Sequence, residues 1–302
     1  MYCLNKQVKV PKNISSAIYF AVTLTMILVL FNCCTKTKNL GNNTKETNVT
    51  PSSTTNVNGE NETETRGENN VKETNADSKT NLTLDDFRGK IAVAYGDSIV
   101  YGAYRAPGDP GAVSRVDERW CDILSTLLEF KSMKNEGESG ISISSTSSVL
   151  PDRAMTKQYN RLPNNAEVIF IAAGTNDFGT NVPLGAISDK EDTSFCGALY
   201  LLCQGLKEKY SDDMVIFITP ISRKDEETNK LGHSLEEYRN MIKKIAGENF
   251  GFTVLNGESF GFEPENESYR EAYMLDGLHP NGQGHVIYAQ KVAEAILGVK
   301  IQ

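Results

Sequence analysis

Short apolar segments that alternate with amphipathic helical patterns are the feature that most restricts how this chain folds. The segments predict strands over residues 91–95, 133–135, 168–173, 214–219 and 253–255. Each is nearly continuous in hydrophobicity, which is typical of strands buried on both faces. Apolar residues at helical spacing predict helices over residues 119–129, 195–209, 235–249 and 284–297. The alternation predicts an α/β domain, with a parallel sheet and helices on both faces.

The first 34 residues have the layout of an export signal. Lys6, Lys9 and Lys12 precede an apolar run over residues 17–31, as a basic region precedes the hydrophobic region of a signal peptide. Cys33 follows this run in a context that resembles the lipobox of bacterial lipoproteins, so we expect lipidation at Cys33. Cys34 is a second candidate, and an uncleaved membrane anchor is the alternative. Either reading predicts a domain outside the cytoplasm, at the cell envelope and tethered to the membrane.

Residues 35–86 differ in composition from the rest of the chain. They are rich in Asn, Thr, Ser, Glu and Lys and lack aromatic residues up to about residue 80. Such a composition buries too little apolar surface to offset the entropy of the chain. We therefore expect a disordered stalk over residues 35–86 and one folded domain over residues 87–302.

Charge and cysteine usage exclude several kinds of partner. The net charge of −8 and the lack of a basic stripe argue against a nucleic-acid partner. Cys121, Cys196 and Cys203 lie among apolar residues without the close pairing of a zinc site, so they are expected to pack as small hydrophobic side chains. A disulfide between Cys121 and one of the other two stays open. No cofactor is expected.

A serine follows the first predicted strand. The tetrapeptide from Gly96 to Ile99 places Ser98 at the carboxyl end of a buried strand, where open α/β sheets carry their chemistry. A turn between strand and helix exposes a serine hydroxyl and directs backbone N–H groups toward it. Val100 stands where the nucleophile elbow of α/β-hydrolases requires glycine, which excludes that class.

Other groups complete a catalytic set. His279 is the natural base, and Asp276 lies close enough in sequence to orient its ring. His233, in a polar loop, is more typical of a surface residue, and His285 of a packed residue at a helix end. Asn176 follows the predicted strand 168–173. A side-chain amide at Asn176 and backbone N–H groups at Gly140 and Ser98 would stabilise an oxyanion.

These motifs together resemble the SGNH hydrolases, also called GDSL esterases and lipases. The resemblance covers about residues 90–298 and rests on four blocks: residues 96–99, 135–140, 174–177 and 276–279. It implies a flavodoxin-like three-layer α/β/α sandwich with Ser98 as nucleophile, His279 as base and Asp276 as orienting acid. It also implies Gly140 and Asn176 as oxyanion donors. Glu138 departs from the family pattern, and its carboxylate is expected to point to solvent.

The predicted activity is hydrolysis of carboxylic esters through an acyl-enzyme, with short acyl groups on a glycan as the expected substrate. Irregular loops over residues 101–116 and 178–192 are expected to wall the pocket, with Tyr101, Tyr104 and Phe178 stacking on a sugar. The alternatives are a lipase or lysophospholipase of the same family, a metal phosphoesterase, and a non-catalytic envelope binding protein. Few histidines are available for paired metals, and a binding protein has no need of the full catalytic set.

Overall fold

The computed structural model describes residues 82–106, 108 and 113–301 of the chain. The predicted leader, the lipidation at Cys33 and nearly all of the predicted stalk lie outside these residues. Within the described ranges, no helix is long and apolar enough to cross a membrane. Among the first described residues, Leu82 and the 3₁₀ helix η1 (Leu84–Asp86) contribute side chains that pack against the core.

The central sheet is parallel, as predicted. Its strands lie in the order β4-β1-β5-β6-β7, and all neighbouring pairs are parallel. This is the flavodoxin-like order, in which the chain reverses its direction of winding next to β1. The strands are β1 (Ile91–Gly96), β4 (Ser132–Gly137), β5 (Val168–Ala172), β6 (Met214–Ile218) and β7 (Thr253–Leu255).

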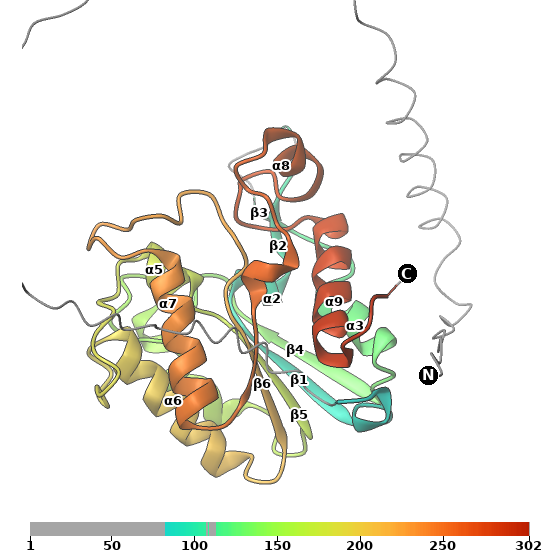
Figure 1. Ribbon diagram of the computed structural model, residues 1–302, viewed down its shortest axis with the longest axis horizontal. Coiled ribbons are helices and arrows are strands. Elements are labelled where there is room, and N and C mark those ends of the chain that lie inside the picture. Colours follow the sequence, from blue (N-terminus) through green and yellow to red (C-terminus); the bar gives the residue numbers. More distant parts are fainter. Residues whose placement is uncertain (1–81, 107, 109–112, 302) are drawn as a thin grey trace, which may run out of the picture. The chain divides into compact units, whose positions relative to one another are not determined.

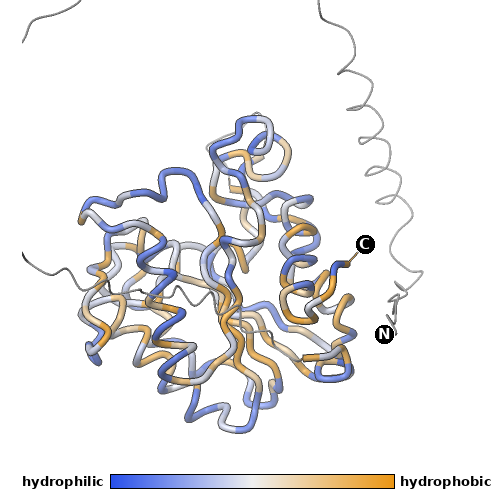
Figure 2. Tube along the Cα trace, in the orientation of Figure 1, coloured by the Kyte–Doolittle hydropathy of each residue, from blue (hydrophilic) through white to orange (hydrophobic). Residues whose placement is uncertain are grey.

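Helices cover both faces of the sheet, which gives the expected three layers. Figure 1 shows α3 (Trp120–Leu127) and α9 (Gly282–Leu297) on one side, and α6 (Phe195–Lys209) and α7 (Leu235–Ile242) on the other. Alternate residues of β1 join different cores: Ala94 packs with Trp120, whereas Val93 packs with the side chains of α6. Figure 2 shows the strands as the most continuous hydrophobic part of the domain. Burial on both faces explains why the strands are apolar throughout.

Two predicted segments differ from the structure. Residues 101–116 contain an antiparallel hairpin of β2 (Ala103–Arg105) and β3 (Val113–Arg115), where only an irregular loop was expected. The predicted helix over residues 235–249 is α-helical only as far as Ile242 and continues as the π-helical segment η4 (Lys243–Asn249). The remaining short helices are α2 (Ser98–Tyr101), η2 (Pro151–Arg153), α4 (Met155–Gln158), η3 (Tyr159–Arg161), α5 (Thr175–Gly179), η5 (Gly257–Phe260) and α8 (Glu267–Tyr273).

The structure confirms that the three cysteines and His285 belong to the core. Cys121, Cys196 and Cys203 are buried and free, so the disulfide left open above does not form. His285, on the first turn of α9, is fully buried, and its Nδ1 accepts a hydrogen bond from the backbone N–H of Trp120 at 3.0 Å. This bond ties α9 to the start of α3.

Candidate active site

The serine of the first motif begins a helix at the carboxyl end of β1. A Cβ atom at Gly96 would collide with the carbonyl oxygen of Ala172, so glycine lets β1 and β5 approach closely here. Asp97 is the N-cap of α2, and its Oδ1 accepts a hydrogen bond from the Ile99 N–H at 2.9 Å. Ser98 is therefore the first residue of α2, with 5% of its surface exposed.

The structure brings Ser98, His279 and Asp276 into one hydrogen-bonded line. Ser98 Oγ lies 2.8 Å from His279 Nε2, and His279 Nδ1 lies 2.7 Å from Asp276 Oδ2. The second oxygen of Asp276 accepts the backbone N–H groups of Leu278 and His279, at 3.0 and 2.8 Å. The carboxylate thus fixes both the loop and the ring, which is the geometry by which a triad aims histidine at serine.

The electrostatic setting keeps Asp276 ionised. Burial raises the pKa of this carboxyl, but the hydrogen bonds from the His279 ring and backbone outweigh it and hold the pKa below its ordinary value. Arg105 Nε lies 3.8 Å from Asp276 Oδ2 and adds a positive charge. An ionised acid at this position stabilises a protonated His279 during turnover.

Asn176 is hydrogen-bonded to the residue that follows Gly140. The Glu138 N–H donates to Gly96 O at 2.9 Å, which holds the segment after β4 against the serine motif. Asn176 Nδ2 donates to Ile141 O at 2.8 Å, which leaves its second N–H for another acceptor. Gly140 has φ +83°, a left-handed conformation that favours glycine. Among the described residues, the Gly140 N–H has no hydrogen-bond acceptor. Each of the two predicted donors thus keeps one N–H that has no acceptor among the described residues.

Asp177, next to Asn176, was not among the predicted site residues. It is fully buried, and its carboxylate accepts the backbone N–H groups of Ile143 and Ser144, at 3.0 and 2.9 Å. Burial raises its pKa to about 7, against the opposing effect of these two hydrogen bonds. Asp177 and Asn176 together fasten the loop after Gly140 to α5. The sequence signal that could have indicated Asp177 is its position in the block of residues 174–177.

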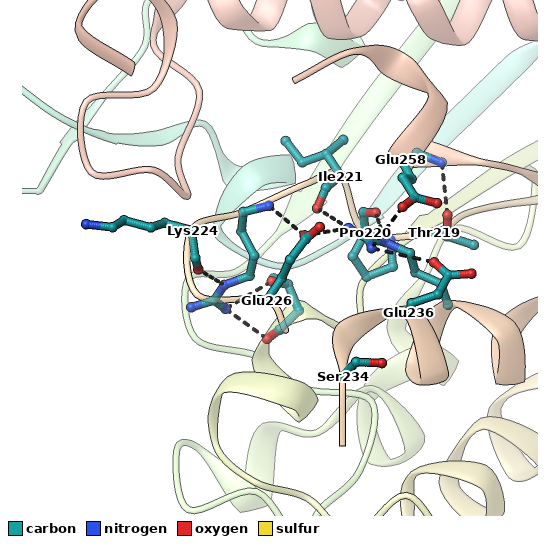
Figure 3. A network of polar contacts seen from close by, with 12 residues as sticks. Thr219, Pro220, Ile221, Lys224, Glu226, Ser234, Glu236 and Glu258 are labelled. Atoms are coloured by element: carbon teal, nitrogen blue, oxygen red, sulfur yellow. Dashed lines mark hydrogen bonds and ion pairs between the residues drawn. The ribbon is translucent and has the colours of Figure 1, made fainter. Parts of the chain in front are cut away.

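A buried arginine supports the loops on the other side of the site. Arg239 donates to Pro220 O at 2.9 Å, to Ile221 O at 3.1 Å and to Glu226 Oε2 at 2.8 Å. Figure 3 shows the labelled Pro220, Ile221 and Glu226 drawn together in this network, with Glu236 and Glu258 close by. The network fixes the loop after β6.

That loop in turn contacts two catalytic segments. The Lys224 N–H donates to Gly277 O at 2.7 Å, which steadies the turn between Asp276 and His279. Arg223 Nη1 donates to the carbonyl and the hydroxyl of Thr175, both at 3.2 Å, next to Asn176. Arg223 and Arg239 were not predicted, because their acceptors are mostly backbone carbonyls, which no side-chain motif reveals.

The Glu138 carboxylate does not point to solvent, contrary to prediction. Its side chain is 17% exposed and is held between two arginines. Arg153 Nε lies 2.6 Å from Oε1, and Arg161 Nη2 lies 3.5 Å from Oε2. Opposite charges remove the cost of an unpaired, partly buried carboxylate, and they offset its charge close to Gly140.

The prediction that Phe178 stacks on substrate is also wrong. Phe178 is 2% exposed and packs edge to face against Tyr238. Val182 and Leu184 of the same loop are buried in the core too, whereas Ile187 is exposed. Tyr101 and Tyr104 remain partly exposed beside the serine helix.

The described residues form no metal site, and the other two histidines do not contact Ser98. Across residues 82–106, 108 and 113–301, no three His, Cys, Asp or Glu side chains are grouped so that they could hold a metal ion. His233 Nδ1 pairs with Glu237 at 3.0 Å in the loop before α7, and His285 lies in the core. His279 is therefore the histidine that the fold brings to Ser98.

Comparison with known proteins agrees with this geometry. The sequence profile of the GDSL-like lipase/acylhydrolase family matches residues 94–287. No curated protein matches the chain in sequence. A solved protein from Lactobacillus plantarum is 26% identical, with a TM-score of 0.60, over 71% of this chain and 99% of that one.

Two further solved structures share the fold. A possible lipase from Chitinophaga pinensis is 20% identical over 68% of this chain and 96% of that chain, with a TM-score of 0.52. A variant of an acetyl xylan esterase from Geobacillus stearothermophilus is 20% identical over 72% of this chain and 98% of that chain, with a TM-score of 0.51. With its serine motif at the end of β1 and this match over the sheet and its flanking helices, the chain belongs to the GDSL-like lipase/acylhydrolase family of ester hydrolases.

Proposed function

We propose that this ester hydrolase removes short acyl groups, acetyl above all, from a glycan outside the cytoplasm. The observation that carries the catalytic part is the line from Ser98 Oγ through His279 to Asp276. The substrate part rests on the surface around Gly140 and on the partly exposed tyrosines near Ser98.

The proposed reaction uses four proton transfers through His279, two while the acyl group is transferred to Ser98 and two while water removes it. His279 Nε2 takes the proton of Ser98 Oγ as that oxygen attacks the ester carbonyl, and the negative charge moves to the carbonyl oxygen. Gly140, Asn176 and the Ser98 N–H donate to this oxyanion. His279 then gives its proton to the departing alcohol, which leaves an acyl group on Ser98. His279 next takes a proton from water as the water oxygen attacks the acyl carbonyl, and returns this proton to Ser98 Oγ as the acid leaves.

The apolar surface beside Gly140 is small. A Cβ placed on Gly140 would lie 3.1 Å from Val149 and 3.6 Å from Leu150, whose side chains are 43% and 39% exposed. The other large apolar side chains that are exposed in the described part of the chain are Val113, Ile187, Leu231 and Val299, and none of them is among the atoms nearest to that Cβ. A long acyl chain needs a contiguous apolar channel. Two side chains suit an acetyl group.

The chain-length preference and the glycan are tested together. The rates on 4-nitrophenyl acetate, octanoate and palmitate are compared first, and acetate release from acetylated xylan is measured next. We expect the acetyl ester to turn over fastest and the polymer to release acetate. Faster turnover of the longer esters, with no acetate from any glycan, would favour the lipase alternative.

Tethering through Cys33 completes the proposal. Stable membrane attachment takes more than one acyl chain, which a lipoprotein cysteine carries. The sequence motif supports Cys33, with Cys34 as the alternative. In cells fed a radiolabelled fatty acid, Cys33→Ser is expected to lose the label, and a Cys34→Ser control to retain it. If the Cys33→Ser protein still carries the label, the lipid is attached to a residue other than Cys33.

A further inference from the structure

A hollow of about 460 Å³ opens at the carboxyl end of β4, next to the oxyanion segment. Its walls include Gly137, Glu138 and Ser139, the Tyr101 ring at the end of the serine helix, and the side chains of Arg153 and Arg161. Ser139 precedes Gly140, so the hollow adjoins the place where the ester carbonyl would lie. Its volume falls within the range of small-ligand sites.

The hollow is lined by two carboxylates, Glu136 and Glu138, and by two guanidinium groups, Arg153 and Arg161. Glu136 is paired with Lys134, which leaves one carboxylate, Glu138, against the two guanidinium groups of Arg153 and Arg161. The chain as a whole carries a net charge of −8, so a positive site is a local arrangement and does not follow from composition. Such a local field attracts anions to one place on an otherwise acidic protein.

The two guanidinium groups keep donors free for a ligand. A guanidinium has five N–H donors, and Glu138 engages Nε of Arg153 and Nη2 of Arg161. The Arg153 side chain is 52% exposed and that of Arg161 is 33% exposed, and both residues line the hollow. Planar guanidinium groups match carboxylates with two parallel hydrogen bonds.

The Tyr101 wall adds a third arginine. The guanidinium carbon of Arg115 lies 4.5 Å from the centre of the Tyr101 ring, and Arg115 Nε donates to Tyr101 O at 3.1 Å. Arg115 belongs to β3, so the hairpin that was not expected from the sequence places a positive charge against Tyr101. An aromatic ring with charged donors around it fits a sugar that carries an acidic group.

We propose that this hollow binds a carboxylate of the alcohol part of the substrate, so that the natural ester is an acylated acidic glycan. The inference rests on the proposed function and narrows its substrate class. A phosphate-bearing glycan presents the same anionic chemistry, and competition by sodium glucuronate and by glycerol phosphate distinguishes the two sources.

The test compares matched substrates on the full chain. KM is measured for acetylated alginate oligosaccharides, which are uronates, for acetylated xylan oligosaccharides of equal length, and for 4-nitrophenyl acetate. We expect a KM for the uronate about tenfold below that for xylan, because a charge-assisted hydrogen bond contributes roughly one factor of ten. Salt is expected to remove the difference, and glucuronate to inhibit more strongly than glycerol phosphate.

Three variants locate the effect. Arg153→Gln and Arg161→Gln are each expected to raise KM for the uronate about tenfold and to leave KM for 4-nitrophenyl acetate unchanged. Arg88→Gln is the matched control, because Arg88 is 51% exposed and also pairs with two acids, Asp85 and Glu129. Its uronate KM is expected to stay at the wild-type value.

Three results would overturn the inference in different ways. If the KM values for uronate and xylan are equal and do not change with salt or with Arg153→Gln or Arg161→Gln, the natural substrate is not an acidic glycan. The protein would then be an esterase of neutral glycans. Hydrolysis of 4-nitrophenyl acetate without acetate release from either glycan would contradict the proposed function itself, and the inference with it. If glycerol phosphate inhibits more strongly than glucuronate, the group that the hollow binds is a phosphate and not a carboxylate.

Discussion

Ser98 and His279 are 181 positions apart in the chain, yet Ser98 Oγ and His279 Nε2 lie within 2.8 Å of each other. The first residue comes from the end of β1 and the second from the loop before α9, so the contact depends on how α9 docks against the sheet. His285 takes part in that docking through its bond from Trp120. The contribution of His285 to the stability of the fold can therefore be measured separately from catalysis.

His285 is expected to make the fold sensitive to acid. Burial lowers its pKa to about 3, below the ordinary value of roughly 6.5 in an unfolded chain. The unfolded state therefore binds the proton first as the pH falls, and the free energy of unfolding decreases between roughly pH 6.5 and pH 3, by up to about 1.4 kcal/mol per pH unit.

His285→Gln tests this, because glutamine keeps an acceptor for the Trp120 N–H but takes up no proton in this range. Urea unfolding at pH 4, 5, 6 and 7 is expected to give a shallower fall in stability than in the wild type. Identical slopes would show that His285 titrates alike in both states.

Asn176→Ala is expected to lower kcat by about 10²- to 10³-fold on 4-nitrophenyl acetate, with a smaller change in KM, because the oxyanion forms mainly in the transition state. Steady-state kinetics checks this, with Asn160→Ala, an exposed asparagine outside the site, as control. A rise in KM at unchanged kcat would place Asn176 in ground-state binding instead.

The negative charge of Glu138 is expected to leave kcat unaffected only while Arg153 and Arg161 neutralise it. Arg153→Gln should lower kcat on 4-nitrophenyl acetate by a few-fold, because a less compensated carboxylate close to Gly140 opposes the developing negative charge. The double variant Glu138→Gln with Arg153→Gln should recover the wild-type kcat. A double variant as slow as the single one would show that Arg153 acts through structure and not through charge.

The sequence predicted the parallel sheet well because its strands are apolar on both faces, so that Val168 and Ile169 both indicate burial although they join different cores. Ser98, Asp276 and His279 could be predicted because each lies in a short motif of recognisable chemistry. Their hydrogen-bonded line agrees with the roles proposed for them.

The parts that the sequence missed depend on packing between distant segments. Phe178 follows Asn176 closely, but the turn of α5 directs its ring into the core against Tyr238. The pairing of Glu138 with Arg153 and Arg161 joins β4 to the short helices η2 and η3, and no local pattern marks it. The hairpin of β2 and β3 escaped prediction because its segment is rich in glycine and proline.

The nucleophile is the central claim, and covalent labelling of Ser98 tests it most directly. The wild-type chain is treated with a fluorophosphonate probe, digested and examined by mass spectrometry, and Ser98→Ala is treated in parallel. We expect the probe on the peptide that contains Ser98, no label on the variant, and loss of its 4-nitrophenyl acetate hydrolysis. Label on another residue, or hydrolysis retained by Ser98→Ala, would contradict Ser98 as the nucleophile.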